Sequence, residues 1–290
     1  MNVRPQNPGL PLAFGSAIAY SLLNIGARYA LDDLGLTVWG LMLVRGLVAL
    51  AVTVTLARFL KINVLGRDRK ILALIGFCSF VSTVLVTLAI GSAPLYQALV
   101  LLYLYPAMTV PLGYFINGDR VSPRDLTLIG LAFGGCLILL WPDHSSGLTL
   151  HWGHLAGAAS PVFYALAYVL ANRLGDGNTG LEPIFYYGCW AAGANLVLIP
   201  LMGLPTGLEG TGAVLPALAL GTLAVAALLM GYAALRWVKA FKVGVIGTLE
   251  VFGGVIASWL VFNDPITIRA LLGGVIILTA ALKLRQSGPE

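Results

Sequence analysis

Charged side chains are scarce in this 290-residue chain. Asp, Glu, Lys and Arg together make up 10% of the residues, whereas hydrophobic residues make up 59%. A soluble domain carries about 25% charged residues, so this chain lacks the polar side chains that a water-facing surface requires. The net charge of +5 comes from basic residues in short loops between apolar runs. This distribution argues against a nucleic-acid-binding surface.

Cysteine and histidine are also rare, at three residues each. Every cysteine falls inside an apolar run, so we expect neither a disulfide framework nor a zinc site. The histidines have no carboxylate or cysteine at helical spacing, and we expect no metal site there either. The residues concerned are Cys78, Cys136, Cys189, His144, His151 and His154.

The sequence also lacks motifs for nucleotide binding and for catalysis. The glycine pairs at 134–135, 253–254 and 273–274 are not followed by Lys-Ser or Lys-Thr, so they form no phosphate-binding loop. Such pairs are typical of closely packed membrane helices. No paired His or Asp motif suited to intramembrane catalysis is present. We therefore expect no cofactor, no direct use of ATP and no enzymatic activity.

Long apolar runs are what the sequence does contain. Runs of roughly 18 to 24 residues recur along the chain, and about 20 apolar residues suffice for a helix to cross the hydrocarbon core of a membrane. Backbone groups in lipid must be hydrogen-bonded internally, so runs of this length favour helices over a barrel. We predict an all-α membrane protein with ten transmembrane helices, at about residues 10–31, 36–58, 71–91, 93–116, 125–141, 152–173, 181–202, 213–236, 242–262 and 267–284.

The chain repeats itself at an offset of 145 residues, which is half of its length of 290. At this offset Leu249 matches Leu104 and Asp264 matches Asp119, with no gap in the register. We therefore predict two copies of one five-helix unit, residues 1–145 and 146–290. Because five is odd, the second copy would cross the membrane upside down relative to the first. Inverted repeats around a central cavity are typical of secondary transporters that work by alternating access.

Lys and Arg are distributed unevenly among the predicted loops. If the N-terminus is cytoplasmic, the outside loops hold only Arg28 and Arg269, and Arg45 lies within the second span. All other Lys and Arg residues then lie in cytoplasmic segments, which is the bias that the positive-inside rule describes. We predict a multi-pass protein of a bacterial-type inner (plasma) membrane with both termini cytoplasmic.

Two turns in the sequence resemble those of a known family. The segment 118–121 reads Gly-Asp-Arg-Val after a proline-containing fourth span, and 263–266 reads Asn-Asp-Pro-Ile at the equivalent place of the second copy. The second turn lacks the Gly and the basic residue. With a Gly-rich fifth span, these features resemble the EamA branch of the drug/metabolite transporter superfamily across essentially the whole chain. The segment 103–106, Tyr-Leu-Tyr-Pro, is similar to the Tyr-Leu-Trp-Pro of its aromatic amino-acid exporters, called YddG. The resemblance implies a ten-helix exporter.

Glu250 is the acidic residue that we place deep in a predicted span. Burial of an ionisable group at this depth costs free energy, so we take Glu250 as a candidate functional residue. The alternative is a Glu that is hydrogen-bonded or protonated in a helix interface. On a helix Glu250 shares a face with Gly247 and Gly254, whose small size would let a substrate approach. We expect Glu250 to face the cavity, where it would either pair with a substrate ammonium group or exchange a proton.

Tyrosines form the second group of candidate binding residues. Tyr103 and Tyr105 lie too deep in the fourth span to be interface anchors. Tyr164 and Tyr168 share a helix face at i, i+4 in the sixth span. The resemblance to the exporters implies that Tyr103, Tyr105 and Tyr164 line the central cavity. Plain packing between helices is the alternative.

Smaller polar side chains complete the predicted site. Tyr20 and Asn24 are spaced i, i+4 in the first span, and Ser79 and Thr83 are spaced likewise in the third. Each pair would either face the cavity or hydrogen-bond a neighbouring helix. Arg45 lies near the middle of the second span, where a lone cation is expensive. We expect it to have a backbone or acidic partner, with binding of a substrate carboxylate as the alternative.

Together these features predict a secondary transporter that exports small metabolites, amino acids above all and aromatic ones included. Efflux of cationic drugs or amphiphiles, and translocation of a lipid-linked substrate, are the alternatives. The predicted partners are a small-molecule substrate and the surrounding membrane lipid. Nothing in the sequence indicates an obligate protein partner.

Overall fold

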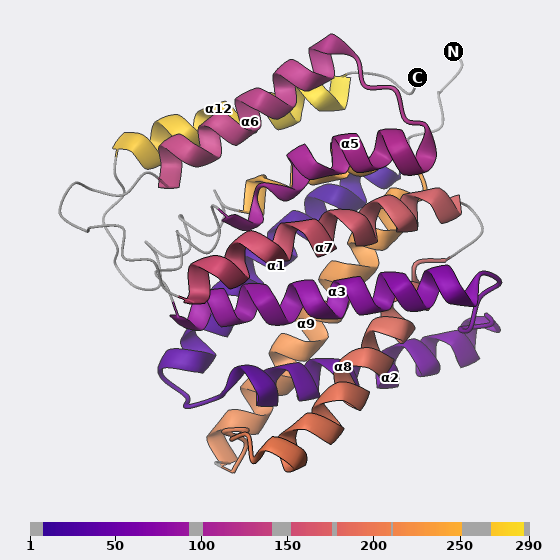
Figure 1. Ribbon diagram of the computed structural model, residues 1–290, viewed down its shortest axis with the longest axis vertical. Coiled ribbons are helices and arrows are strands. Elements are labelled where there is room, and N and C mark those ends of the chain that lie inside the picture. Colours follow the sequence, from indigo (N-terminus) through magenta and orange to yellow (C-terminus); the bar gives the residue numbers. More distant parts are fainter. Residues whose placement is uncertain are drawn as a thin grey trace.

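The computed structural model describes residues 8–92, 101–140, 152–175, 179–209, 211–250 and 268–286, which form ten helices and no strand (Figure 1). Predictions about His144 and His151, the start of the fourth span and most of the ninth lie outside the described residues. The helices are α1 (Gly9–Asp32), α2 (Val38–Leu60), α3 (Arg69–Ser92), α5 (Tyr105–Asn117), α6 (Pro123–Leu140), α7 (Trp152–Leu174), α8 (Leu181–Met202), α9 (Thr211–Leu235), α10 (Ala240–Gly247) and α12 (Ile268–Gln286).

Local sequence signals set the helix ends. The Thr37 hydroxyl accepts a hydrogen bond from the Gly40 N–H at the start of α2, 3.2 Å long, which satisfies one of the free N–H groups of the first turn. Gly118 follows the last residue of α5 and adopts a left-handed conformation with φ of 71°, a conformation that glycine tolerates without steric cost. Wherever a whole predicted span is described, the helix ends lie close to the predicted ones.

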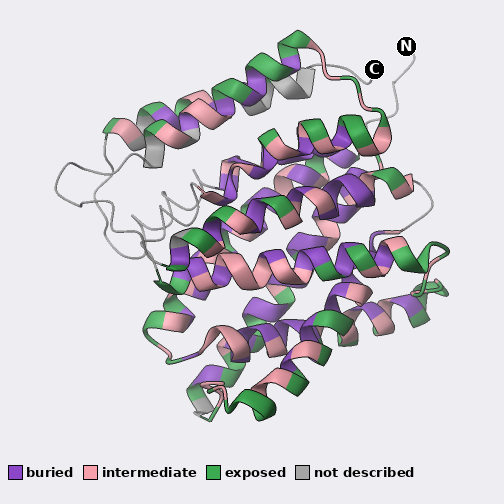
Figure 2. Ribbon diagram, in the orientation of Figure 1, coloured by how far each residue is buried: buried purple, intermediate pink, exposed green. Residues whose placement is uncertain are grey.

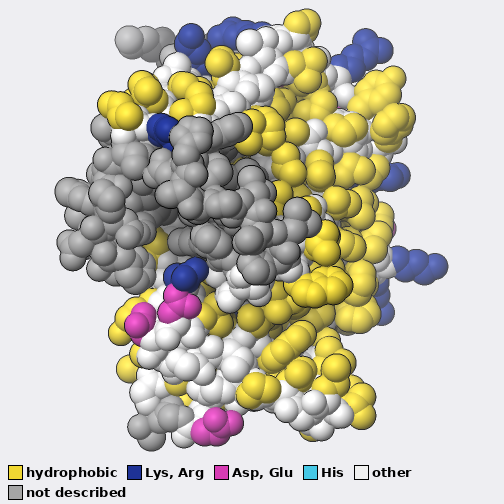
Figure 3. Space-filling view, turned by 60° about the vertical axis from the view of Figure 1, so that its left-hand side comes forward, with side chains coloured by type: hydrophobic (Ala, Val, Ile, Leu, Met, Phe, Trp, Pro, Cys, Tyr) yellow, Lys and Arg dark blue, Asp and Glu magenta, His cyan; other side chains and the backbone are white. Residues whose placement is uncertain are grey.

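The outer surface of the helix bundle is apolar. Phe59, Phe115 and Leu201 are each more than three-quarters exposed, and the buried residues face inward (Figure 2). Hydrophobic side chains form a broad area in Figure 3, with Lys and Arg along its upper and right-hand margins. Six described helical segments are long and apolar enough to cross a membrane: Gly9–Asp32, Val38–Leu60, Arg69–Ser92, Leu155–Leu174, Leu181–Met202 and Gly212–Leu235.

Helices of the two halves pack against each other reciprocally. By the 145-residue offset, α1, α2 and α3 correspond to α7, α8 and α9, and α6 corresponds to α12. Helix α1 packs on α9, and α3 packs on α7. Helix α2 packs on its own counterpart α8, and α6 packs on α12 (Figure 1). Among the described helices, the contact of α1 with α9 therefore recurs as that of α7 with α3, with the roles of the two halves exchanged. This is the pattern that a two-fold relation produces.

Two glycines at equivalent positions allow these close contacts. A Cβ atom at Gly76 of α3 would lie 2.5 Å from the carbonyl carbon of Tyr186 in α8. Gly221 of α9 stands 145 residues later, and a Cβ there would lie 3.1 Å from Val48 Cγ2 in α2. Small residues let membrane helices approach closely, so the same device serves both halves.

Two helices are also interrupted at equivalent positions. Tyr103 and Leu104 form a turn directly before α5, and Thr248 forms a turn at the end of α10, 145 residues after Tyr103. In the first half, Pro106 has no N–H to donate, so the regular helical hydrogen bond to Leu102 is missing at this point. In the second half, the Thr248 hydroxyl donates to the Val245 carbonyl at 2.6 Å. Both interruptions lie next to the cavity described below.

Candidate substrate-binding cavity

A small cavity lies among α1, α2, α3, α7 and the two interrupted helices. Its volume is about 50 Å³, which is room for a few water molecules. Apolar side chains and a small set of polar groups line it, a composition typical of ligand sites. The lining residues are Tyr20, Leu23, Asn24, Ala27, Arg45, Ser82, Thr83, Val86, Thr87, Ile90, Leu102, Tyr105, Tyr164 and Glu250.

Glu250 contributes a buried carboxyl group, only 6% exposed, to this cavity. The Asn24 amide of α1 donates a hydrogen bond to Glu250 Oε1 at 2.5 Å, and the Ser21 hydroxyl donates to the Glu250 backbone carbonyl at 2.9 Å. The Tyr103 hydroxyl also interacts with the Glu250 side chain. Helix α1 thus holds both the backbone and the side chain of Glu250 in place, directly after the interruption of α10.

Tyr105 joins the two interrupted helices. Its hydroxyl donates to the Gly244 carbonyl of α10 at 3.1 Å and lies against Gly247, where a Cβ atom would collide with it. The Tyr105 ring also meets the Tyr164 ring edge-on, with centroids 4.7 Å apart and an interplanar angle of 81°. The absence of a side chain at Gly247 is therefore what allows Tyr105 to reach α10 from the cavity wall.

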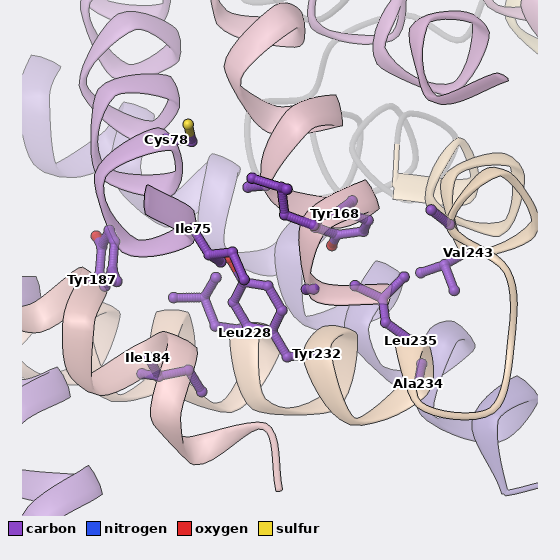
Figure 4. Close-up of a cluster of buried hydrophobic side chains, with 14 of the residues drawn as sticks. Ile75, Cys78, Tyr168, Ile184, Tyr187, Leu228, Tyr232, Ala234, Leu235 and Val243 are labelled. Atoms are coloured by element: carbon purple, nitrogen blue, oxygen red, sulfur yellow. The ribbon is translucent and has the colours of Figure 1, made fainter. Parts of the chain in front are cut away.

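Further tyrosines extend from the cavity into the main hydrophobic core. The hydroxyls of Tyr164 and Tyr168 are 2.8 Å apart, and Tyr168 lies near Tyr232, with ring centroids 6.1 Å apart. The Tyr232 hydroxyl in turn hydrogen-bonds the Ser79 hydroxyl of α3. Figure 4 shows Tyr168 and Tyr232 within this core together with Ile75. We call Tyr105, Tyr164, Tyr168 and Tyr232 the tyrosine cluster; it links α5, α7 and α9.

Hydroxyl groups on α3 give the cavity a polar wall. Thr83 donates to the Ser79 carbonyl and Thr87 donates to the Thr83 carbonyl, each at 2.7 Å. These bonds use the hydroxyl protons, so the oxygen lone pairs are left to accept hydrogen bonds. The Ser82 and Ser160 hydroxyls, 3.0 Å apart, tie α3 to α7 beside the cavity.

Arg45 of α2 also lines the cavity and is 4% exposed. Its Nε atom is buried and has no hydrogen-bond partner. Tyr187 and Tyr20 are the ionisable groups that influence it. The acidic or backbone partner expected for Arg45 is not found among the described residues, where the ion pair present is that of Arg28 with Asp32 at the surface.

The predicted site residues divide into two groups by position. Tyr20, Asn24, Thr83, Tyr105, Tyr164 and Glu250 line the cavity. Ser79, Tyr103, Tyr168 and Gly247 stand directly behind that wall, where they contact the lining residues or the tyrosine cluster.

Sequence reasoning did not assign the cavity residues Ser82, Thr87 and Arg45 to the site. The spacing of Thr87 from Thr83 continues the same i, i+4 face, and this signal could have included it. The signal at Arg45 was stronger than that at Thr87, because ionisable residues inside membrane spans are rare and usually functional.

The chain matches a known protein family along most of its length. A model of the "EamA-like transporter family" matches the chain twice, at residues 7–141 and 151–285. The chain belongs to the EamA-like transporter family. It is accordingly a multi-pass helical membrane protein and a transporter. The two matched segments contain, respectively, the Tyr103–Leu104 turn and the Thr248 turn, so each family unit contributes one interrupted helix to the cavity.

Two individual proteins add to the family assignment. An "Uncharacterized transporter" of Archaeoglobus fulgidus is 26% identical over 217 residues, which cover 74% of this chain and 76% of that protein. A crystal structure with 17% sequence identity superposes with a TM-score of 0.80 and covers 97% of this chain and 99% of the other. At that identity the structural likeness establishes a shared fold.

Proposed function

We propose that the protein is a secondary transporter that exports small metabolites, with amino acids, aromatic ones included, as the main class of substrate. The observation that carries the proposal is the cavity between two helices interrupted at equivalent positions of the two family units, with Glu250 in its wall. Interrupted helices in corresponding positions of two repeats mark the binding sites of many secondary transporters.

Inverted repeats would supply the movement that such a transporter needs. Each half holds five predicted spans, and an odd number reverses the orientation of the second half. The reciprocal packing of α1 on α9 and of α3 on α7 is what two related halves facing each other would produce. Rocking of one half against the other would then expose the cavity to each side of the membrane in turn.

The size of the cavity supports a movement of this kind. Ligand pockets usually measure about 300–1,000 Å³, whereas this cavity measures about 50 Å³. An amino acid therefore requires the halves to separate before it enters. The tyrosine cluster, which extends from one end of the cavity into the core, is the packing that such a separation would rearrange.

The lining chemistry suits a substrate with an ammonium group and an apolar or aromatic part. Glu250, oriented by Asn24, would accept hydrogen bonds from the ammonium group. Tyr105 and Tyr164 already meet edge-on and offer ring surfaces to an aromatic side chain. We place the transporter in a bacterial-type inner membrane with both termini cytoplasmic, because the positive-inside bias favours that orientation.

Efflux of cationic amphiphiles is the second candidate, and one observation favours it: Glu250 is the acidic residue among the residues that line the cavity. In that case one carboxyl group would bind the drug and the coupling proton in competition. The presence of Arg45 in the same wall weighs against this candidate, because a cation repels a cationic drug.

Transport by the purified protein in liposomes tests both candidates. Vesicles would be loaded separately with amino acids, nucleosides, sugars and a cationic dye, and efflux of each labelled solute would be compared with that from protein-free vesicles. Amino-acid efflux stimulated by an amino acid on the opposite side is the expected result. Efflux of the dye alone would replace the proposal with its rival, and efflux of nucleosides or sugars alone would reject both.

A further inference from the structure

Arg45 and Glu250 place a basic and an acidic group in the wall of one cavity. Arg45 comes from α2 of the first half, and Glu250 follows α10 in the second half. Both are almost fully buried, at 4% and 6% exposure. No ion pair joins them: the Glu250 carboxyl group is held by Asn24 instead, and the ion pair found in the described part of the chain is Arg28–Asp32.

Burial of a guanidinium group without a counter-charge is unfavourable in free energy. Burying a charge costs far more than burying a polar group unless the charge is paired or fully hydrogen-bonded. Arg45 has neither form of compensation among the described residues: its Nε atom lacks a hydrogen-bond partner, and its electrostatic neighbours are the phenols of Tyr187 and Tyr20. A purely structural arginine would be expected to satisfy these donors within the protein.

We propose that Arg45 binds an anionic group of the transported solute, a carboxylate, while Glu250 binds its ammonium group. The inference rests on the proposed function and narrows it, because the substrates would be zwitterions, and a cation without a carboxylate would bind poorly. The planar guanidinium group presents paired N–H donors that match a carboxylate. Binding of the solute would thus supply the partner that Arg45 lacks.

The side chains around Arg45 fit this role. Thr83 and Thr87 lie in the same wall and donate their hydroxyl protons to backbone carbonyls of α3, so they have no proton left to donate to a carboxylate of the solute. Asn24 is committed to Glu250. Among the cavity-lining residues Arg45 is therefore the group whose charge suits a carboxylate.

The test compares two solutes that differ by one carboxylate, L-phenylalanine and phenethylamine. Liposomes would contain the wild type, Arg45→Gln, Arg45→Lys or Arg58→Gln, a control at an exposed arginine of the same helix. We expect Arg45→Gln to raise the KM for phenylalanine by about 10- to 100-fold, the size expected for a lost charge-assisted bond. Inhibition by phenethylamine should weaken by less than about 3-fold or become stronger, because phenethylamine makes no bond to Arg45 and the variant lacks a repelling cation. Arg45→Lys should be intermediate, and Arg58→Gln should match the wild type.

Other outcomes would reject the inference in distinguishable ways. An equal loss for both solutes in Arg45→Gln would show a structural role for Arg45, with the proposed function intact. An unchanged KM for phenylalanine would also remove Arg45 from the site. If Arg45→Gln does not fold, the comparison is made between the wild type and Arg45→Lys. The inference is overturned if the wild type and Arg45→Lys show the same preference for phenylalanine over phenethylamine. The proposed function itself would be overturned if the wild type transported phenethylamine but not phenylalanine. It would also be overturned if the wild type transported neither solute and no other amino acid.

Discussion

Tyr105 and Glu250 occupy equivalent positions in the two halves of the chain, 145 residues apart, and both side chains line the same cavity. Each stands just after the interruption of its helix. One position supplies an aromatic ring and the other a carboxyl group. A duplicated framework therefore surrounds a chemically asymmetric site, in which the first half provides an aromatic surface and the second provides an acid.

Replacement of the Glu250 carboxyl group tests its role in binding. Glu250→Gln removes the charge that would attract a substrate ammonium group while keeping nearly the same shape. We expect the KM for amino-acid exchange in liposomes to rise about 10-fold, as for loss of a charge-assisted hydrogen bond. The maximal exchange rate should stay substantial, because exchange needs no net proton movement. Loss of both cation binding and proton coupling would instead support the drug-efflux candidate.

Asn24 should act through Glu250. Asn24→Ala removes the donor to Glu250 Oε1, so the carboxyl group loses its fixed orientation. We expect the KM for an amino acid to rise about 3- to 10-fold, in line with one hydrogen bond to a charged group. Asn172→Ala is the matched control, because Asn172 donates to the carbonyls of Leu235 and Val238 at the end of α9. That control should lower the unfolding temperature and leave the KM unchanged; equal KM values in both variants would contradict this role.

The contact of Tyr105 with Gly247 predicts non-additive mutations. A Cβ in Gly247→Ala would displace the Tyr105 hydroxyl from the Gly244 carbonyl, at a cost of about 1–2 kcal/mol in the free energy of unfolding. In Tyr105→Phe the hydroxyl is gone, so adding Gly247→Ala should cost much less. Thermal unfolding of the two single variants and the double variant measures this coupling.

Gly193→Ala serves as the control for that cycle. Gly193 of α8 has open space where a Cβ would stand, so alanine there should be neutral or stabilising. Additive effects of Gly247→Ala and Tyr105→Phe would show that the hydroxyl does not occupy the space beside Gly247.

The edge-on pair of Tyr105 and Tyr164 predicts a preference for aromatic substrates. Tyr164→Leu removes one ring, and an aromatic contact of this type contributes about 0.5–1.5 kcal/mol. We expect the ratio of kcat/KM for phenylalanine over leucine to fall about 3- to 10-fold, which corresponds to that energy. Tyr164→Phe keeps the ring and gives up the hydroxyl contact with Tyr168, so it should retain the ratio. A ratio that is insensitive to Tyr164→Leu would place the substrate elsewhere.

The orientation of the two halves is open to direct labelling. Lys70 lies in the first turn of α3 and Lys239 precedes α10, and the inverted-repeat proposal puts both on the cytoplasmic side. Single cysteines at these positions, in a protein lacking Cys78, Cys136 and Cys189, should react with an impermeant maleimide only from that side. Reaction from opposite sides would rule out inverted repeats and, with them, alternating access as proposed.

Much of the helical framework could be predicted because its signals are local. Apolar runs located the described helices closely. A constant 145-residue offset predicted two related units, and the family model matches the chain at residues 7–141 and again at 151–285. The interruptions were harder to see. Pro106 gave a cue in the first half, but Thr248 has no adjacent proline, and its hydroxyl bond to Val245 emerged only in the structure.

The sequence by itself determined that this is a multi-pass membrane protein, because composition and the length of the apolar runs decide that property. It also predicted two related halves and singled out Glu250 as a candidate, from the 145-residue offset and from the depth of Glu250 within a predicted span. Tertiary structure alone decided which groups meet. Asn24 and Glu250 are 226 residues apart in the chain yet hydrogen-bonded, and no local pattern encodes that distance. The same holds for Arg45: helical packing places it in the cavity wall without an acidic partner among the described residues, and packing between helices distant in sequence is set by the whole fold.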